Sequence, residues 1–333
     1  MNKQQHFQKI FDLADLFQLS AILFFANKEN IFDLLVEKQT FELIAQYKNW
    51  IPWKTKVILD SLVAMELIKK EGIYYQNFQF TTLALSKKSK DYIGDLLEHE
   101  RLQWKVWSKI ENILVSEDIT QEQQEIRLEN DEYANHVFNS AMAQLSNDLI
   151  DYVLNLSDWH DKNYVIDIAG GHGVYLAKLI QKYPQISGEI WDLSTSKDYA
   201  IKVINDFNLS HKIKFVEKDI TLKESYSNIR CNGILINHCL HHFLDNQVMD
   251  IFNYVFNILD EGGIISIIEP YLDENCIEPK SNVIFSAYMM INRQYGKLHD
   301  SLWIEHKLKD IGFKVETKQL NNLENDIMFI ARK

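Results

Sequence analysis

Cysteine, proline and glycine are all scarce in this sequence, and each shortage excludes a class of structure. The 333 residues include 3 cysteines, 4 prolines and 11 glycines. Because the cysteines, Cys231, Cys239 and Cys276, are odd in number and scattered, they do not form a disulfide framework and indicate reduced thiols in a cytosol. With so little proline and glycine, long structureless linkers are not expected, and helices should dominate.

Long apolar runs and an excess of positive charge are missing as well. No stretch of about 18 apolar residues occurs and the first residues contain no apolar signal core, so we predict a soluble cytoplasmic protein with no membrane partner. The formal net charge is -12. Because binding to phosphates needs a basic surface, nucleic acid is not expected as a main partner.

The most informative stretch of the chain runs from residue 164 to residue 180. Residues 164–168 form an apolar run rich in β-branched side chains, which predicts a buried parallel strand. The small residues at 169–173 then predict a turn, and apolar residues follow at helical spacing. A strand, a glycine-rich turn and a helix in this order are typical of the start of a nucleotide-binding α/β domain.

The composition of that turn narrows the choice of ligand. Gly170, Gly171 and Gly173 let the backbone approach a ligand closely, but the turn lacks the Lys-Ser/Thr of a P-loop and is too short for a full G-x-G-x-x-G. Asp167 near the strand's end would repel a pyrophosphate, whereas it suits a cationic or neutral cofactor such as S-adenosylmethionine. A tight turn without a ligand is the alternative.

The length of the chain predicts two domains, and the first half has its own pattern. Residues 6–27 carry apolar side chains at helical spacing and need a partner surface. The elements that follow predict a winged-helix arrangement, with helices at 31–35, 40–47 and 54–70 and a hairpin at 73–75 and 78–81. A DNA-binding regulator is therefore an alternative function, although the first hundred residues are not strongly basic.

The second half alternates strands and helices, which predicts a doubly wound, mostly parallel sheet. Strands are expected at 187–191, 212–216, 233–237 and 264–268, with a final pair at 313–315 and 327–331, and helices at 245–259 and 302–311. We therefore expect three segments: a helical, winged-helix-like domain at 1–115, a connection and linking helix at 116–156, and an α/β domain at 157–333.

Acidic residues and histidines follow several of the predicted strands, where such sheets bind their ligands. Asp192 follows Asp167 at close to the roughly 20-residue offset at which an acidic side chain binds a ribose. Asp219 follows the next strand. For both Asp192 and Asp219, a capping role at the following helix is the alternative.

Residues 237–242 contain three histidines and a cysteine. A metal site is the first possibility, but no C-x-x-C or H-E-x-x-H completes one, so no metal is expected. A histidine in a cleft is more often a general base, and Glu269, one strand further on, could orient it. For any single histidine, local hydrogen bonding is the alternative.

Four stretches, in this order along the chain, carry a resemblance to a known family. They are FNSAM at 138–142 with Ser146, DIAGGHG at 167–173, LHHFLD at 240–245 and IIEPYL at 267–272. With them the chain resembles the S-adenosylmethionine-dependent O-methyltransferases of the plant caffeic acid and hydroxyindole type, in their shorter bacterial form. The resemblance covers nearly the whole chain.

The resemblance implies a fold, a cofactor and a site. The fold would be a Rossmann-like methyltransferase domain with a seven-stranded, mostly parallel sheet, preceded by a mostly helical winged-helix domain that forms a homodimer and buries residues 6–27. His241 would be the catalytic base and Glu269 the residue that holds it. Residues implied to bind S-adenosylmethionine are Ser146, Asp167, Gly170, Gly171, Gly173, Asp192, Leu193, Asp219, Ile220 and Asn237. Residues implied to bind the acceptor are Phe138, Met142, His242 and Tyr288.

Two residues depart from the plant pattern. His242 stands where many plant members have Asp, and Leu298 stands where they place a second Glu beside the histidine. The expected function is methyl transfer to a hydroxyl of a small aromatic acceptor of the kind found in secondary metabolism. The alternatives are C- or N-methylation, a non-methylating enzyme of the same fold, or a winged-helix regulator that senses a metabolite.

Overall fold

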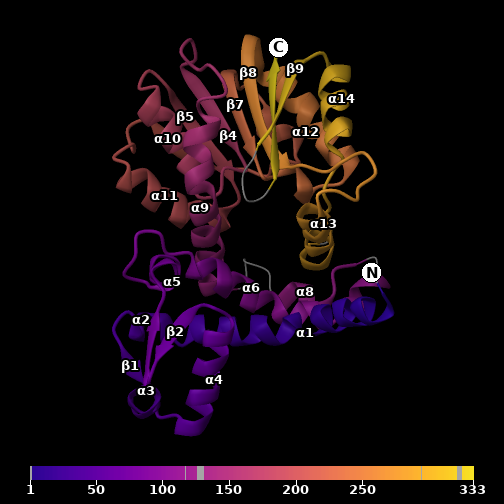
Figure 1. Ribbon diagram of the computed structural model, residues 1–333. Helices are drawn as coiled ribbons and strands as arrows, with labels where there is room; N and C mark the ends of the chain where they lie inside the picture. The colour runs from indigo at the N-terminus through magenta and orange to yellow at the C-terminus, as the bar shows by residue number, and fades with distance from the viewer. Residues whose placement is uncertain (1, 117, 126–130, 294, 321–324) are drawn as a thin grey trace. The chain divides into compact units, whose positions relative to one another are not determined.

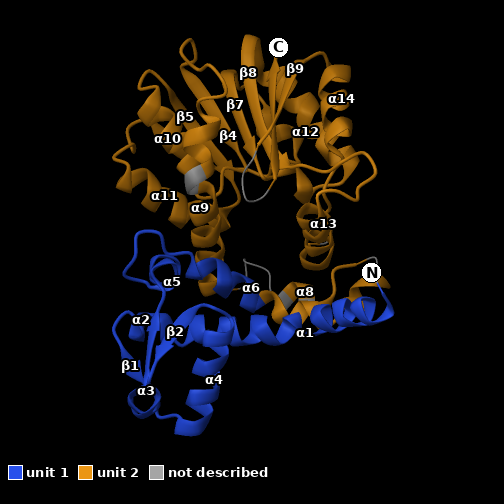
Figure 2. Ribbon diagram, viewed as in Figure 1, with its two compact units in different colours: residues 1–102 blue, residues 103–333 orange. Residues whose placement is uncertain are grey.

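The structure, a computed structural model, describes residues 2–116, 118–125, 131–293, 295–320 and 325–333 (Figure 1). The chain forms two compact units, Met1–Leu102 and Gln103–Lys333 (Figure 2). The boundary falls within helix α6 (Gly94–Trp107). The three-segment division expected from the sequence remains a prediction, and within its connecting segment residues 117 and 126–130 lie outside the described residues.

The first unit contains a small three-stranded sheet among helices. Its elements are α1 (Lys3–Lys28), α2 (Ile31–Leu34), β1 (Gln39–Thr40), α3 (Phe41–Lys48), α4 (Pro52–Ala64), β2 (Ile68–Glu71), β3 (Tyr74–Asn77) and α5 (Gln79–Leu85). The strands pair antiparallel in the order β1-β3-β2. Its core is made of fully buried aromatic and aliphatic side chains that include Phe32, Leu59, Leu62, Ile68 and Tyr75.

The structure places the hairpin of this unit earlier than the sequence pattern predicted. Helix α4 ends at Ala64, and residues 68–71, of which 68–70 were expected to belong to a helix at 54–70, form strand β2. Gly72 lies in the hairpin turn with a φ of +62°, a conformation that glycine adopts without strain. Residues 79–81, expected to be a strand, begin helix α5. The hairpin prediction was therefore right in kind and wrong in position.

Helix α1 carries an apolar face that nothing in the described structure covers. Phe7, Ile10, Leu13 and Phe17 recur at spacings of three and four, and each is between 52% and 63% exposed. By length and composition α1 is also the one helix among the described residues that could cross a membrane. That criterion is weak, because core helices and signal sequences meet it too.

The second unit is built on a seven-stranded sheet. Its strands are β4 (Tyr164–Ile168), β5 (Ser187–Asp192), β6 (Ile213–Glu217), β7 (Cys231–Asn237), β8 (Leu259–Pro270), β9 (Lys314–Gln319) and β10 (Asp326–Arg332). Its helices are α7 (Ile110–Leu114), α8 (Gln121–Glu125), α9 (Glu132–Val153), α10 (Val174–Lys182), α11 (Lys197–Asp206), α12 (Asp245–Ile258), α13 (Lys280–Asn292) and α14 (Ser301–Ile311). Among the described residues, short 3-10 turns include η2 (Ser194–Ser196), η3 (Lys223–Tyr226) and η4 (Leu240–His242).

The order of the strands determines where a ligand can bind. The sheet runs β6-β5-β4-β7-β8-β10-β9, with parallel pairs from β6 to β8 and antiparallel pairs at β8-β10 and β10-β9. Because the chain leaves β4 first toward β5 and later returns to β7 on its other side, the strand order reverses at β4. In open α/β sheets this switch point, at the carboxyl ends of the strands, is where ligands bind.

Helices cover both faces of this sheet (Figure 1). One core layer joins α9, α10 and α11 to the sheet, and the other joins α12 and α14 to it. Strand β4 serves both layers, because Val165 packs into the first while Ile166 and Ile168 pack into the second. Its continuous apolar run is explained by this burial on two faces.

Strands β4 and β5 lie so close together at Gly188 that there is no space for a side chain at this position. A Cβ atom at Gly188 would lie 1.9 Å from the carbonyl oxygen of Val165. We expect Gly188→Ala to lower the free energy of unfolding by about 1–3 kcal/mol, the usual cost of overpacking a core. Urea unfolding followed by circular dichroism measures it. Ser187→Ala, at the neighbouring position of the same strand, is the control, and an equal loss in both variants would contradict the steric explanation.

Candidate active site

The glycine-rich turn after β4 has a backbone of positive φ angles, which its glycines permit. Ala169, Gly171 and Gly173 all have positive φ angles, of 53°, 48° and 75°. Glycine tolerates this conformation, but Ala169 does so at a cost, and such strain is concentrated at functional sites. Gly170 approaches Asp167 so closely that a Cβ atom there would lie 2.6 Å from the carboxyl carbon.

Asp167 is buried at the end of β4 with one oxygen unsatisfied. Among the described residues nothing donates a hydrogen bond to its Oδ2 atom. Burial, reinforced by the nearby charge of Asp192, raises the pKa of Asp167 to about 8. A buried carboxylate costs free energy unless a donor or a cation meets it, so this atom is a candidate ligand-binding group.

Asp192, at the end of β5, holds the turn in place. Its Oδ2 atom accepts a hydrogen bond of 2.7 Å from the Gly171 amide, and its Oδ1 atom accepts from the Leu193 amide at 2.7 Å and the Ser196 hydroxyl at 3.2 Å. Burial raises the pKa of Asp192 despite these bonds. The Leu193 side chain is half-exposed beside it.

The positions of Asp219 and Ile220, after β6, give less support for a role in ligand binding. Asp219 is exposed, and its Oδ1 atom accepts from the amide and hydroxyl of Thr221 at 2.9 and 2.6 Å. Ile220 packs into the sheet's core. The geometry of Asp219 is that of a local turn anchor, the alternative considered for it from the sequence.

A buried pair of ionisable side chains lies at the ends of β7 and β8. His241, on η4, places its Nδ1 atom 2.7 Å from Oε2 of Glu269, while the other carboxylate oxygen accepts from the amides of Cys239 and Leu240, each at 2.7 Å. Burial alone would raise the pKa of Glu269, but the charge and hydrogen bond of His241 outweigh it and hold that pKa below its usual value. Because Glu269 is ionised, Nδ1 of His241 carries the proton and Nε2 is the basic nitrogen.

The other two histidines of this stretch are placed differently. His238 has a φ of 50°, and its Nε2 atom lies 3.7 Å from a carboxylate oxygen of the buried Asp326. His242 lies with its ring 4.6 Å from that of His241, and burial together with the charge of His241 lowers the pKa of His242 well below its ordinary value. Among the described residues, no group of three or more metal-ligating side chains could hold a metal ion.

The two halves of the site meet at the strand ends around Cys239. Burial first, and then the charges of Glu269, Asp192 and Asp167, raise the pKa of the Cys239 thiol well above its usual value. The side chain of Asn237 at the end of β7 is buried, and within the described structure neither its oxygen nor its nitrogen has a hydrogen-bond partner. The structure therefore brings together the predicted residues at the ends of β4, β5, β7 and β8.

Comparison with known proteins identifies the family. The family model described as the O-methyltransferase domain matches residues 122–314. The chain belongs to this family.

Individual relatives agree over the full length. The chain is similar to the solved structure of an O-methyltransferase family protein from Burkholderia thailandensis, with 32% identity, a TM-score of 0.93, and 98% and 97% of the two chains covered. It shares the fold of human N-acetylserotonin methyltransferase, solved in complex with S-adenosylmethionine, at 20% identity and a TM-score of 0.85, with 100% and 99% covered. The N,N-dimethyltransferase OxyT of Streptomyces rimosus is 22% identical, with 98% and 96% covered.

The chain is thus an S-adenosylmethionine-dependent methyltransferase of small molecules, with the expected seven-stranded fold. The residues at the strand ends fit such a cofactor, which is cationic at sulfur and at its amino group. Asp167 offers an unsatisfied carboxylate oxygen, Asn237 offers an unsatisfied amide, and Gly170 and Gly171 leave room for close approach. The hydrogen bond from the Gly171 amide to Asp192 ties this turn to the end of β5.

Helix α9 connects the cofactor turn of the methyltransferase to the predicted acceptor residues. Ser146 donates to the carbonyl of Met142 at 2.8 Å, and its hydroxyl lies 3.4 Å from Nε2 of His172, a residue of the turn itself. Phe138 and Met142 are both partly buried on the same helix. The contribution of His172 was missed from the sequence, because nothing in DIAGGHG distinguishes its histidine from a spacer.

An aromatic wall beside His241 was also missed. It consists of Trp107, Phe285, Tyr288 and the His241 ring itself, and of these side chains only Tyr288 and His241 were named from the sequence. The signal was the i, i+3 spacing of Phe285 and Tyr288 on α13. Leu298, which the resemblance places where plant members have a second glutamate, is buried against Leu272 and Met289.

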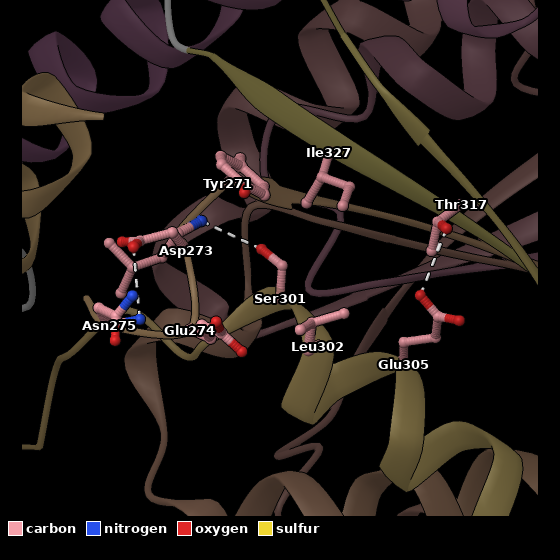
Figure 3. A pocket seen from close by; sticks show the side chains of 10 residues that line it. Tyr271, Asp273, Glu274, Asn275, Ser301, Leu302, Glu305, Thr317 and Ile327 are labelled. Atoms are coloured by element: carbon pink, nitrogen blue, oxygen red, sulfur yellow. Dashed lines mark hydrogen bonds between the residues drawn. The ribbon is translucent and has the colours of Figure 1, made fainter. Parts of the chain in front are cut away.

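A pocket of about 420 Å³ lies elsewhere in this unit, and Figure 3 shows the side chains that line it. None of the residues predicted for the site lines it. Its walls are Tyr271, Leu272, Asp273, Glu274, Asn275, Ser301, Leu302, Glu305, Thr317 and Ile327. Two of the carboxylates in it have partners of their own: Asp273 accepts from the amides of Asn275, Ile277 and Glu278, and Glu305 pairs with Lys309 and accepts from the hydroxyl of Thr317.

The buried carboxyl of Asp167 should cost stability in the cofactor-free enzyme. Its pKa is raised on folding, so the penalty grows as the pH rises from about 4, the usual value for Asp, through the folded value of about 8. We expect Asp167→Asn to raise the free energy of unfolding at pH 8 by about 1 kcal/mol or more, and to weaken binding of S-adenosylmethionine in calorimetry. Asp206→Asn, at an exposed position, should change neither. An Asp167→Asn variant that is less stable at pH 8 than the parent would contradict the assignment.

Proposed function

We propose that this methyltransferase transfers the methyl group to a hydroxyl of a small aromatic acceptor, with His241 as general base. The single observation that carries the proposal is the bond of 2.7 Å between Nδ1 of His241 and Glu269. It leaves Nε2 as the basic nitrogen, and within the described part of the chain no hydrogen bond to that nitrogen is found. The base is thus poised at the ligand-binding edge of the sheet.

The chemistry divides between cofactor and protein. When bound, S-adenosylmethionine supplies a methyl group on a sulfonium that needs little activation. The acceptor hydroxyl does need activation, and Nε2 of His241 would take its proton as the oxygen attacks. The imidazolium so formed would be stabilised by the ionised Glu269, as in other base–carboxylate pairs. Asp167, Asn237 and Asp192 would hold the cofactor, and Ser146 would lie beside it.

The aromatic wall supports a planar acceptor. Trp107 and Tyr288 lie with ring centroids 6.1 Å apart, Tyr288 and Phe285 stack at 5.6 Å, and Phe285 meets the ring of His241 edge-on at 5.5 Å. This series of ring contacts ends at the proposed base, and its faces and edges are surfaces on which another aromatic ring can pack. Phe138, Met142 and His242 would complete the acceptor pocket.

An amine acceptor is the second candidate, because OxyT, which aligns with almost the entire chain, is named as an N,N-dimethyltransferase. A DNA-binding regulator is less well supported. In the winged-helix region Lys56 and Lys70 both bind Asp60 at 2.6 Å, so two of the cations that would contact phosphates are already paired. A screen of phenols and amines with isotopically labelled S-adenosylmethionine, read by mass, distinguishes oxygen from nitrogen as the methylated atom.

His241→Ala should lower kcat by about two to four orders of magnitude, the range for losing general-base help, while cofactor binding stays nearly intact. Glu269→Gln should cost less, because orientation is lost but the base remains. The effect should shrink with acceptors whose hydroxyl is already ionised at the assay pH. His211→Ala, at an exposed loop position, is the control. Near-normal turnover of His241→Ala on an acceptor of high pKa would overturn the assignment.

We propose further that two copies of the enzyme associate through α1. The exposed face of Phe7, Ile10, Leu13 and Phe17 is too apolar and too continuous to remain in water, and a specific dimer needs about 1,000 Å² of buried surface. This assembly in turn supports a cytoplasmic enzyme over a membrane-bound one, since the same helix would be covered by its partner.

Phe17→Glu should shift the full-length enzyme toward the monomer, because it places a charge within that apolar face. Light scattering coupled to size-exclusion chromatography measures the mass. Gln8→Glu adds the same charge on the polar side of α1 and should leave the mass unchanged. If the parent protein is itself monomeric at micromolar concentration, the dimer proposal fails.

A further inference from the structure

The short turn that carries His241 is held on its carbonyl side by a residue that neither the fold nor the sequence motifs single out. Nε2 of His299 donates hydrogen bonds to the carbonyl oxygens of Leu240, at 3.1 Å, and Phe243, at 3.0 Å. These two residues flank His241 and His242. The amide of Lys297 binds the carbonyl of His241 itself at 3.0 Å.

Contacts with Trp303 and Asp245, besides the two carbonyls, hold the ring of His299 in position. It is 6% exposed and stacks on Trp303 of α14 with ring centroids 5.2 Å apart and an angle of 17°. Its Nδ1 atom lies 3.1 Å from a carboxylate oxygen of Asp245, the first residue of α12, and Lys297 binds that same oxygen at 2.7 Å. The turn, α12 and α14 therefore meet at this one imidazole.

The bonds to the turn do not depend on the charge of the ring. Both groups facing Nε2 are carbonyl oxygens, which only accept hydrogen bonds, so Nε2 must carry a proton. It does so in the neutral Nε2–H tautomer as well as in the imidazolium. The two bonds to the carbonyls of Leu240 and Phe243 thus persist whether or not Nδ1 is protonated toward Asp245.

The residue between Lys297 and His299 explains why this support matters here. Leu298 stands where the resemblance places a second glutamate, and it packs against Leu272 and Met289 without contributing a charge. The ring of His241 therefore has one carboxylate partner, Glu269, on its Nδ1 side. With only this partner, the position of the ring depends on how firmly the backbone of the turn is held.

We propose that His299 is a positioning residue for methyl transfer: it holds the carbonyls of Leu240 and Phe243 so that Nε2 of His241 stays aligned with the acceptor oxygen. The inference rests on the proposed role of His241. A shift of the turn by about 1 Å would misplace the base, and misplacement of that size can cost about 100-fold in rate. His299 touches neither reactant in this scheme and acts through His241.

Three variants of the full-length enzyme test the proposal. His299→Phe keeps an aromatic ring to stack on Trp303 but removes the Nε2–H group that donates to both carbonyls. His299→Gln restores an amide that can donate to both carbonyls from about the position of Nε2. His306→Gln, at an exposed position of α14, is the matched control. The measurements are kcat, KM for the acceptor, the dissociation constant of S-adenosylmethionine, the unfolding midpoint, and the NMR resonance of the His241 Nδ1 proton bonded to Glu269.

His299→Phe should lower kcat by about 10- to 100-fold, with the cofactor dissociation constant changed less than about twofold, since the cofactor turn lies on other strands. The Nδ1 proton resonance should shift or broaden, and His299→Gln should recover most of kcat and the resonance. If His299→Phe does not fold, His299→Gln decides the question. A resonance and a kcat equal to those of the parent support the proposal, and a shifted resonance with a lowered kcat overturns it. An unchanged kcat and resonance in a folded His299→Phe also overturn it.

This experiment separates the two proposals. Should His241→Ala retain its turnover, the general-base proposal fails, but the resonance in His299→Phe still reports whether His299 positions the ring. Should His241→Ala lose its turnover while His299→Phe keeps both resonance and kcat, only the positioning role of His299 is wrong. A loss of kcat that merely follows the folded fraction measured by unfolding counts against positioning.

Discussion

The carboxylate of Glu269 is the interaction on which the proposed site depends. It is almost fully buried, and it accepts hydrogen bonds from the amides of Cys239 and Leu240 and from Nδ1 of His241. A buried carboxylate without partners would become protonated, whereas one with three donors remains ionised. The same group therefore shapes the backbone of the turn, selects the tautomer of His241 and supplies the charge that an imidazolium would need. These roles depend on β8 delivering Glu269 next to β7, which the parallel pairing of the two strands ensures.

At the proposed cofactor side of the site, the carboxylates are less well compensated than Glu269. Asp167 and Asp192 are two carboxylates at the ends of adjacent strands, and burial raises the pKa of both. Asp192 offsets this cost by accepting hydrogen bonds from Gly171 and Leu193, but Asp167 keeps an unsatisfied oxygen. The unsatisfied oxygen of Asp167 and the positive φ of Ala169 both raise the free energy of the folded state. Binding sites often carry such local costs, because a ligand that removes them binds more tightly.

Much of this could be predicted from the sequence because the signals were local. The run at 164–168 has the composition of a strand buried on both faces, and strand order places Asp167, Asp192, His241 and Glu269 at one edge. The hairpin of the first unit was misplaced because its register depends on Gly72 rather than on the aromatic residues that follow it. Only part of the aromatic wall could be predicted, from Tyr288 and its i, i+3 spacing to Phe285. Its contacts with Trp107 and His241, and the role of His299, could not, since they join segments far apart in the chain. A histidine that supports a turn 56 residues away has no periodicity or motif to reveal it.

The raised pKa of Asp167 has a consequence for the thermodynamics of binding. At neutral pH the carboxyl of the cofactor-free enzyme is largely protonated, since its pKa lies at about 8. A cationic ligand lodged beside that carboxyl favours its ionised form and so displaces the proton into the solvent. Binding and proton release are then one linked equilibrium, in which affinity rises with pH until the carboxyl is already ionised in the free enzyme. The heat of binding would accordingly include the ionisation heat of whichever buffer takes up the proton.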